Sequence, residues 1–187
     1  MAIDKEKIAA LTEEYGGGWG INHTRRLLKL IETIGEGQEY DREAVWLACY
    51  LHDWGGYKPW IQEGVDHALR SKQVAGEYLE KAGIDPKQKE RVLECIEYHH
   101  RATKDNSTEA ALLFDADALD FLGAVGVLRR FSMTPRDLKK AFDAAKGQME
   151  KLPGALIFDK SRAMAKERLP GMKALLETFE KETFGLY

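Results

Sequence analysis

The stretch LACYLHDWGGYKPW, residues 47–60, joins the end of an apolar helical pattern to a histidine and an aspartate. Its first half has the spacing of the last turns of a buried helix. His52 and Asp53 then follow side by side, before two glycines and among aromatic residues. Ionisable groups at the end of a buried helix are costly unless they cap it, pair or coordinate an ion. The pair is therefore either a local cap or part of a polar cluster in the interior.

Helical patterns with clear start and stop signals flank this stretch on both sides. An aspartate or threonine directly before a proline, at 85–86 and 134–135, is a strong helix start. No segment alternates with the period of a strand. We therefore predict an all-α fold, a compact bundle of about seven to nine helices. The expected helices run over about 4–16, 22–34, 41–53, 66–83, 85–100, 108–131, 134–151 and 159–184, the last interrupted at 170–171.

Composition indicates an ordinary globular chain. Of its 187 residues, 44% are hydrophobic and 32% charged, and the net charge of −3 gives no sign of a nucleic-acid groove. The charged N-terminus lacks a signal peptide and no run is long enough to span a membrane, so we expect a cytoplasmic protein. Cys49 and Cys95 fall at apolar helical positions and are expected to be buried free thiols. The oligomeric state is not indicated.

The five histidines are concentrated in the first hundred residues, each near the end of an expected helix. They are His23, His52, His67, His99 and His100. Helix bundles build metal sites from side chains that several helices project inward, and imidazole with carboxylate suits first-row divalent ions. The pattern therefore suggests a metal site, although each histidine could instead be an individually hydrogen-bonded group.

The order of these motifs resembles a known family. His23, the His-Asp pair 29 residues later, YHHR at 98–101 and LLFDADALDFLGAVGV at 112–127 look like the HD-domain superfamily of metal-dependent phosphohydrolases. The resemblance is to small bacterial members that carry H…HD…D with a DADxLD segment. It covers about residues 19–131. We expect one HD domain over 1–187, with the helices at about 134–187 packing on that motif core.

The resemblance implies a primary metal site and leaves the number of ions, one or two, open. Its ligands would be His23, His52, Asp53 and Asp117. Asp115 would then cap a helix or support the site; the alternative is that Asp115 and Asp117 exchange these roles. In branches of the family with two ions, the second is held by residues matching His67 and one of His99 or His100, with Asp53 bridging. Otherwise these histidines line the pocket of a single ion.

The ion implied is divalent: Mn, Mg, Fe, Ni, Co or Zn. Such an ion lowers the pKa of water and polarises a phosphoryl oxygen, so the expected activity is hydrolysis of a small phosphate ester or nucleotide, as a phosphomonoesterase or phosphodiesterase. Asp53, Lys58 and Arg101 are the expected catalytic residues, the two cations by holding phosphate oxygens. For Lys58 and Arg101 a solvated surface role is the alternative. A module that binds metal and nucleotide without hydrolysis and a di-iron oxygenase are the other functions considered.

Several neighbours of the motifs have two interpretations each. Asp120 either orients a ligand imidazole or forms an ion pair. Trp54, Tyr57 and Trp60 either wall the pocket or pack in the core. The glycines at 55–56 are expected to let the backbone approach a metal and its phosphate ligand.

Overall fold

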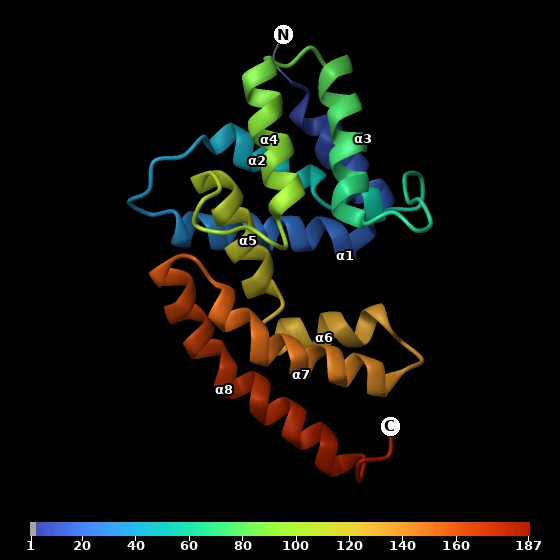
Figure 1. Cartoon of the computed structure of the whole chain (residues 1–187). Coiled ribbons are helices and arrows are strands. Elements are labelled where there is room, and N and C mark those ends of the chain that lie inside the picture. The colour runs from blue at the N-terminus through green and yellow to red at the C-terminus, as the bar shows by residue number, and fades with distance from the viewer. Residues whose placement is uncertain (1–2) are drawn as a thin grey trace. The chain divides into compact units, whose positions relative to one another are not determined.

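The computed structural model describes residues 3–187, and within that range the chain folds into helices alone (Figure 1). Eight α-helices and one short 3-10 helix are present there, and no strand, which confirms the all-α prediction. No helix of the described chain is long and apolar enough to cross a membrane. The elements are α1 (Lys5–Ile34), α2 (Arg42–Leu51), η1 (Trp54–Gly56), α3 (His67–Lys81), α4 (Pro86–Tyr98), α5 (Thr108–Asp120), α6 (Gly123–Met133), α7 (Leu138–Ala155) and α8 (Asp159–Glu182).

The chain forms two compact units, one up to Phe114 and one from Asp115 onward, and α5 spans the boundary. In the first unit, α2 packs against α1 and α4, while α3 packs against α4 and η1. In the second unit, α6, α7 and α8 pack against one another. All five histidines belong to the first unit.

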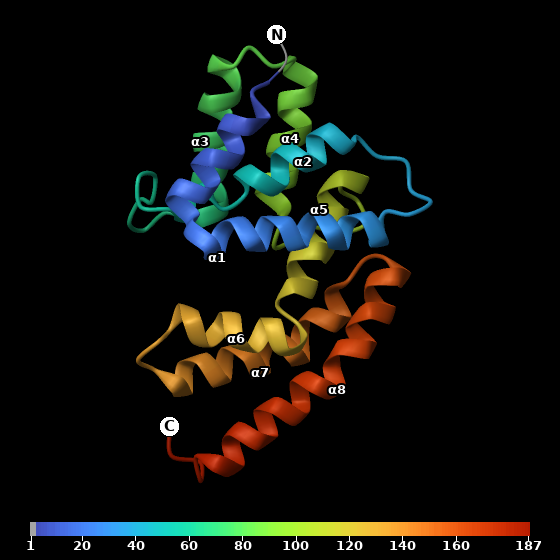
Figure 2. The ribbon, with the colours of Figure 1, turned by 180° about the vertical axis from the view of Figure 1, so that it is seen from behind.

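Helix α1 is bent where the sequence predicts a stop. Asp4 caps its first turn by accepting from the Lys7 N–H, 2.9 Å away. Gly17 leaves the helical region, with φ 57° and ψ −165°, a conformation that favours glycine. The second segment follows directly, earlier than the predicted start at residue 22, and Figure 2 shows the bend. It carries His23 into the interior of the unit.

The three predicted aspartate caps of this unit are confirmed. Asp41, Asp66 and Asp85 each accept hydrogen bonds from two backbone N–H groups in the first turns of α2, α3 and α4. Ser107 rather than Thr108 caps α5, with its hydroxyl accepting from the Ala110 N–H at 3.2 Å. These caps fix where α2 begins, and its ten residues then lead to the His-Asp pair.

In the second unit, the predicted single helix over 108–131 is wrong. Helix α5 ends at Asp120 and α6 begins at Gly123, whose φ is +77°. A residue with a side chain would be strained there, so the backbone turns at this glycine. The glycine also lies close to the side chain of Arg168, because a Cβ would come within 3.3 Å of it.

Two further predictions fail at proline. Thr134 ends α6 instead of starting α7, because its hydroxyl donates to the Arg130 carbonyl 3.1 Å away, and Asp137 provides the cap of α7. At Pro170 a kink or a break is expected, and the break is absent, because α8 is one helix from Asp159 to Glu182. The carbonyl that loses its partner belongs to Lys166, an exposed residue, so water can satisfy it.

Candidate metal centre

The end of α2 delivers His52 and Asp53 by a change of backbone conformation. The helix ends at Leu51, His52 keeps helical angles, and Asp53 turns to φ −103° and ψ 0° before η1 begins. Gly55 is required by packing, because a Cβ there would come within 2.3 Å of the Ser71 backbone nitrogen in α3. Gly56 faces open space. Close packing against α3 therefore explains the glycine at 55, and the expectation that Gly56 makes room for a metal and its phosphate ligand stays a prediction.

Three side chains, His23, His52 and Asp53, form what we call the inner group. Nε2 of His23 lies 3.2 Å from Nε2 of His52. Oδ2 of Asp53 lies 3.4 Å from Nε2 of His52 and 3.8 Å from Nε2 of His23. Both imidazoles are only 1% exposed and the carboxylate 18%. Three potential ligand atoms therefore converge on one point in the interior.

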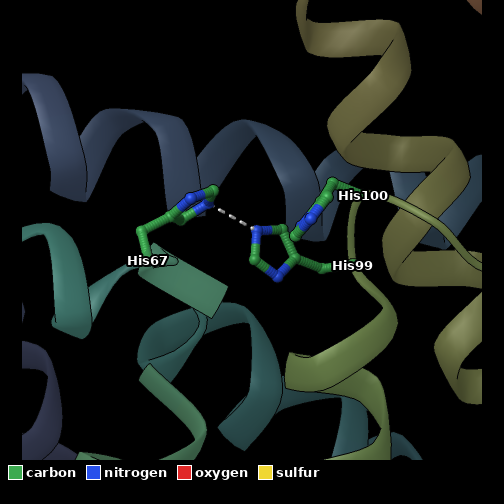
Figure 3. A group of neighbouring side chains, drawn as sticks. All are labelled: His67, His99 and His100. Carbon is green, nitrogen blue, oxygen red and sulfur yellow. Dashed lines mark hydrogen bonds between the residues drawn. The ribbon is translucent and has the colours of Figure 1, made fainter. Parts of the chain in front are cut away.

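A second cluster, the outer group, consists of His67, His99 and His100 (Figure 3). Nε2 of His67, at the first residue of α3, lies 3.1 Å from Nε2 of His99, at the end of α4. The His100 ring stacks on His67 with centroids 5.3 Å apart. His99 is buried, whereas His67 and His100 are exposed. The outer group is therefore open to solvent on one side.

One histidine in each group is held in a single tautomer by the backbone. Nδ1 of His52 donates to the Cys49 carbonyl at 2.9 Å, and Nδ1 of His99 donates to the Ile96 carbonyl at 2.7 Å. A carbonyl only accepts, so each Nδ1 carries a proton, and in the neutral form of each ring the lone pair is on Nε2. Histidines that bind metals are commonly oriented in this way. Both Nε2 atoms are presented as ligands.

Asp53 lies between the two groups. Its Oδ2 faces His23 and His52, and its Oδ1 lies 3.9 Å from Nε2 of His67. Burial alone would raise the pKa of the Asp53 carboxyl, but the charge and hydrogen bond of His52 and the charges of His23 and His99 outweigh it, and the pKa lies well below its ordinary value. The carboxylate is therefore ionised at neutral pH, with an oxygen toward each group.

The spacing of these atoms fits divalent metal ions. Two nitrogens that bind one ion at about 2.1 Å and at a right angle lie about 3.0 Å apart. The paired Nε2 atoms of the inner and outer groups, at 3.2 and 3.1 Å, are close to that separation. Without an ion, one nitrogen of each pair donates a proton to the other. The grouping of imidazole and carboxylate could hold a divalent ion, and it does not distinguish one first-row metal from another.

The acidic residues of DADALD divide into different environments. Asp115 is fully buried and accepts from the N–H groups of Ile157 and Phe158 at 2.9 Å, so it holds the segment that leads into α8. Burial raises the pKa of Asp115, and these hydrogen bonds only partly oppose it. Asp120 pairs with buried Arg129 at 2.6 Å, which supports the ion-pair interpretation. Asp117, the remaining predicted ligand, is 8% exposed on α5 in the second unit, and its ligand role stays a prediction.

The two predicted catalytic cations lie on the surface of the first unit. Arg101 approaches Glu97, with 3.3 Å between Nη2 and Oε1, and lies over the Tyr98 ring. Lys58 is exposed in the segment after η1. Their catalytic roles remain predictions.

The aromatic residues of the opening stretch have structural roles. Trp54 is fully buried, stacks on Trp60 with centroids 4.6 Å apart, and donates its indole N–H to the Thr12 hydroxyl at 2.9 Å. Tyr57 is buried against α1, so closely that a Cβ at Gly20 would come within 2.5 Å of its hydroxyl. Core packing is therefore the interpretation that fits for Trp54 and Tyr57.

Sequence reasoning missed the carbonyl partners of His52 and His99. A histidine at the end of a helix can reach the carbonyl three residues earlier, and both residues occupy that position. It also missed Trp19, which lies one helical turn before His23 with a 6.0 Å separation between ring centroids. The sequence did contain a signal for Trp19, because an aromatic residue stands four positions before His23, a proposed ligand.

The ends of three helices and the middle of a fourth gather histidines around one aspartate in an all-α fold. Such a histidine–carboxylate grouping in a helical protein could hold a metal ion. The chain belongs to the HD domain family, which its sequence matches over residues 20–122, more than half of its length. No curated protein matches the chain significantly.

Three solved structures illustrate the relationship. A predicted HD superfamily hydrolase from an uncultured Thermotogales bacterium is 25% identical, with a TM-score of 0.67 over 95% of this chain and 91% of its own. YpgQ of Bacillus subtilis, determined in complex with ADP, is 24% identical, with a TM-score of 0.72 over 95% and 94%. An HD-superfamily hydrolase from Bacillus thuringiensis is 21% identical, with a TM-score of 0.70 over 98% and 97%. This chain has the fold of HD-superfamily hydrolases along nearly all of its length.

Proposed function

We propose that this protein is a metal-dependent phosphohydrolase that hydrolyses a small phosphate ester, with a nucleotide as the favoured substrate class. The observation that carries the proposal is the position of Asp53, whose two oxygens face two separate sets of imidazole nitrogens. Membership of the HD domain family and the hydrolase relatives support it. The ADP complex of Bacillus subtilis YpgQ supports the nucleotide class.

The ligand set divides between the two groups. His23, His52 and Asp53 would hold the first ion, with Asp117 as the predicted fourth ligand from α5. His67 and His99 would hold a second ion, with Asp53 shared between the two. His99 is favoured over His100 because it is buried and its Nδ1 is fixed by a carbonyl, which leaves Nε2 as the ligand atom. His100, stacked on His67, would orient that ring or complete the shell.

Divalent ions bound here would lower the pKa of water and draw charge from a phosphoryl oxygen. The chain itself contributes fixed geometry. The backbone bonds of His52 and His99 keep both lone pairs aimed inward, so little reorganisation is needed when charge develops. Asp53 contributes negative charge that balances the ions. Lys58 and Arg101 would hold the outer phosphate oxygens from the surface side.

The test is a metal and substrate panel. Protein stripped with EDTA is reloaded with Mn, Mg, Fe, Co, Ni or Zn and assayed for phosphate release from nucleoside mono- and diphosphates, sugar phosphates and a phosphodiester. We expect activity only after reloading and a loss of at least about 100-fold in His52→Ala. The control is Asp85→Asn, which alters an exposed helix cap whose side-chain bonds go to its own helix and leaves activity unchanged.

The outcomes separate the alternatives. Nucleotide binding without release of phosphate by any reloaded form would favour a binding module. Activity that requires iron and oxygen would favour an oxygenase. Hydrolysis that persists in EDTA, or in His52→Ala at the wild-type rate, would contradict the proposed centre.

A further inference from the structure

Trp19 lies beside the inner group and is partly open to solvent. It belongs to the second segment of α1, four residues before His23, and its ring centroid is 6.0 Å from that of His23 with the planes inclined at 43°. Its side chain is 38% exposed, whereas Trp54, after the His-Asp pair, is fully buried. An aromatic face therefore borders a predicted ligand instead of being enclosed in the core.

The backbone that leads into Trp19 lacks side chains. The two residues before Trp19 are glycines. A Cβ at Gly17 would meet no atom within 4 Å, and one at Gly18 would meet only the Asn22 amide at 3.8 Å. Gly17 has a positive φ, which fixes the bend that turns α1 at this point. The backbone just before Trp19 therefore carries no side chain on two successive residues.

We propose that Trp19 is a specificity-determining residue that stacks on the base of a nucleotide substrate; this rests on the proposed phosphohydrolase function. In a nucleotide a pentose separates the base from the first phosphate, so a phosphate at the inner group places the base one sugar away from His23. The ring of Trp19, whose centroid is 6.0 Å from that of His23, is a partly exposed aromatic surface beside that residue. Stacking on an indole accepts any base, because every base has a π-face. Trp19 would select nucleotides over phosphate esters that lack a base.

The experiment measures binding of three probes to Mn-loaded protein by calorimetry: ADP, ribose 5-phosphate and inorganic phosphate. ADP is checked for integrity by chromatography after each titration. Base stacking is worth about 1–3 kcal/mol, so Trp19→Ala is expected to weaken ADP binding by about 5- to 150-fold. Binding of ribose 5-phosphate, inorganic phosphate and Mn is expected to stay within about twofold of wild type. Trp19→Phe, which keeps a stacking face, restores most of the ADP affinity.

Tyr15→Ala is the matched control. Tyr15 lies on the same helix with the same 38% exposure, but its ring packs edge-on against Trp60. Tyr15→Ala is expected to bind ADP as tightly as wild type. If it lost as much ADP affinity as Trp19→Ala, damage to α1 would explain both losses and the inference would be overturned. The inference also fails if wild type prefers ADP no more than ribose 5-phosphate, or if Trp19→Ala weakens all probes alike. Failure of wild type to bind Mn or any phosphate would instead contradict the proposed function.

Discussion

The two ends of α2 carry two aspartates whose pKa values are both lowered, for different reasons. At the start of the helix, burial raises the pKa of Asp41, and the backbone N–H of Ala44, the side chains of Gln88 and Arg91, and the N–H of Glu43 more than reverse it. At the other end, Asp53 is surrounded by imidazoles. The neighbours of Asp41 are all hydrogen-bond donors, which satisfy its oxygens within the protein.

The contrast shows that a lowered pKa does not by itself mark a functional site. The carboxylate of Asp41 is saturated by donors and holds a helix in place. The carboxylate of Asp53 faces imidazole nitrogens, which are potential metal ligands, and a divalent cation could take the place of their protons. An aspartate that caps a helix is therefore surrounded by hydrogen-bond donors, whereas an aspartate that binds a metal is surrounded by other groups that can bind the metal.

The largest effect expected from this comparison is on metal affinity. Asp53→Asn should lower Mn affinity by more than about 100-fold, since even loss of a partner that only orients a ligand costs 10–100-fold. Asp41→Asn should leave Mn affinity within about twofold of wild type. Isothermal titration of both proteins with Mn makes the measurement. Equal losses in the two variants would remove the distinction between cap and ligand.

Substitutions of single histidines distinguish the inner group from the outer group. His52→Ala removes a buried inner ligand and is expected to abolish binding of both ions, because Asp53 would lose its main partner. His67→Ala removes an exposed outer ligand and should leave one ion per chain. Elemental analysis after dialysis against Mn gives the stoichiometry. One ion in wild type would show that the outer histidines line a pocket instead.

A smaller effect, on the free energy of unfolding, is expected at the glycines that follow the His-Asp pair. Gly55→Ala forces a Cβ into the backbone of α3 and is expected to destabilise the fold by about 1–3 kcal/mol. Gly56→Ala enters open space and should change the free energy of unfolding by less than about 0.5 kcal/mol. Urea unfolding of the metal-free proteins measures both. Similar values for the two variants would mean that α3 does not hold this end in place.

The smallest effect concerns the cap. Asp41→Ala should cost about 1 kcal/mol at neutral pH. Because the pKa of Asp41 in the folded chain lies below its ordinary value of 3.8, its stabilisation is present above that value and is lost as pH falls through the lower folded value. The difference in unfolding free energy between wild type and Asp41→Ala should therefore shrink below about pH 4. A constant difference from pH 7 to pH 2.5 would contradict the assignment.

Helix starts could be predicted where a single side chain caps its own backbone, as at Asp41 and Asp85. The errors fall where tertiary context decides. Thr134 bonds backward to Arg130, so it ends a helix although a proline follows it. The turn at Gly123 depends on a positive φ, which sequence patterns alone do not reveal.

For the site, the pattern of histidines suggested a metal centre, and the resemblance to the HD-domain superfamily predicted which residues belong together. The five histidines and Asp53 were identified because so many ionisable groups at helix ends need partners. The tautomers of His52 and His99, and the orientation of the two Asp53 oxygens, depend on backbone geometry at the helix ends. Asp115 and Asp117 look alike in the sequence, and only the structure shows that Asp115 binds the backbone of the segment before α8.

The most direct test of the central claim, that Asp53 bridges two ions, is anomalous X-ray diffraction from crystals grown with Mn. The account predicts two anomalous peaks about 3.5–4 Å apart, one beside His23 and His52 and one beside His67 and His99, with an oxygen of Asp53 toward each. One peak at the inner group, with His67 turned to solvent, would contradict the bridging role. Peaks remote from Asp53 would contradict the site altogether.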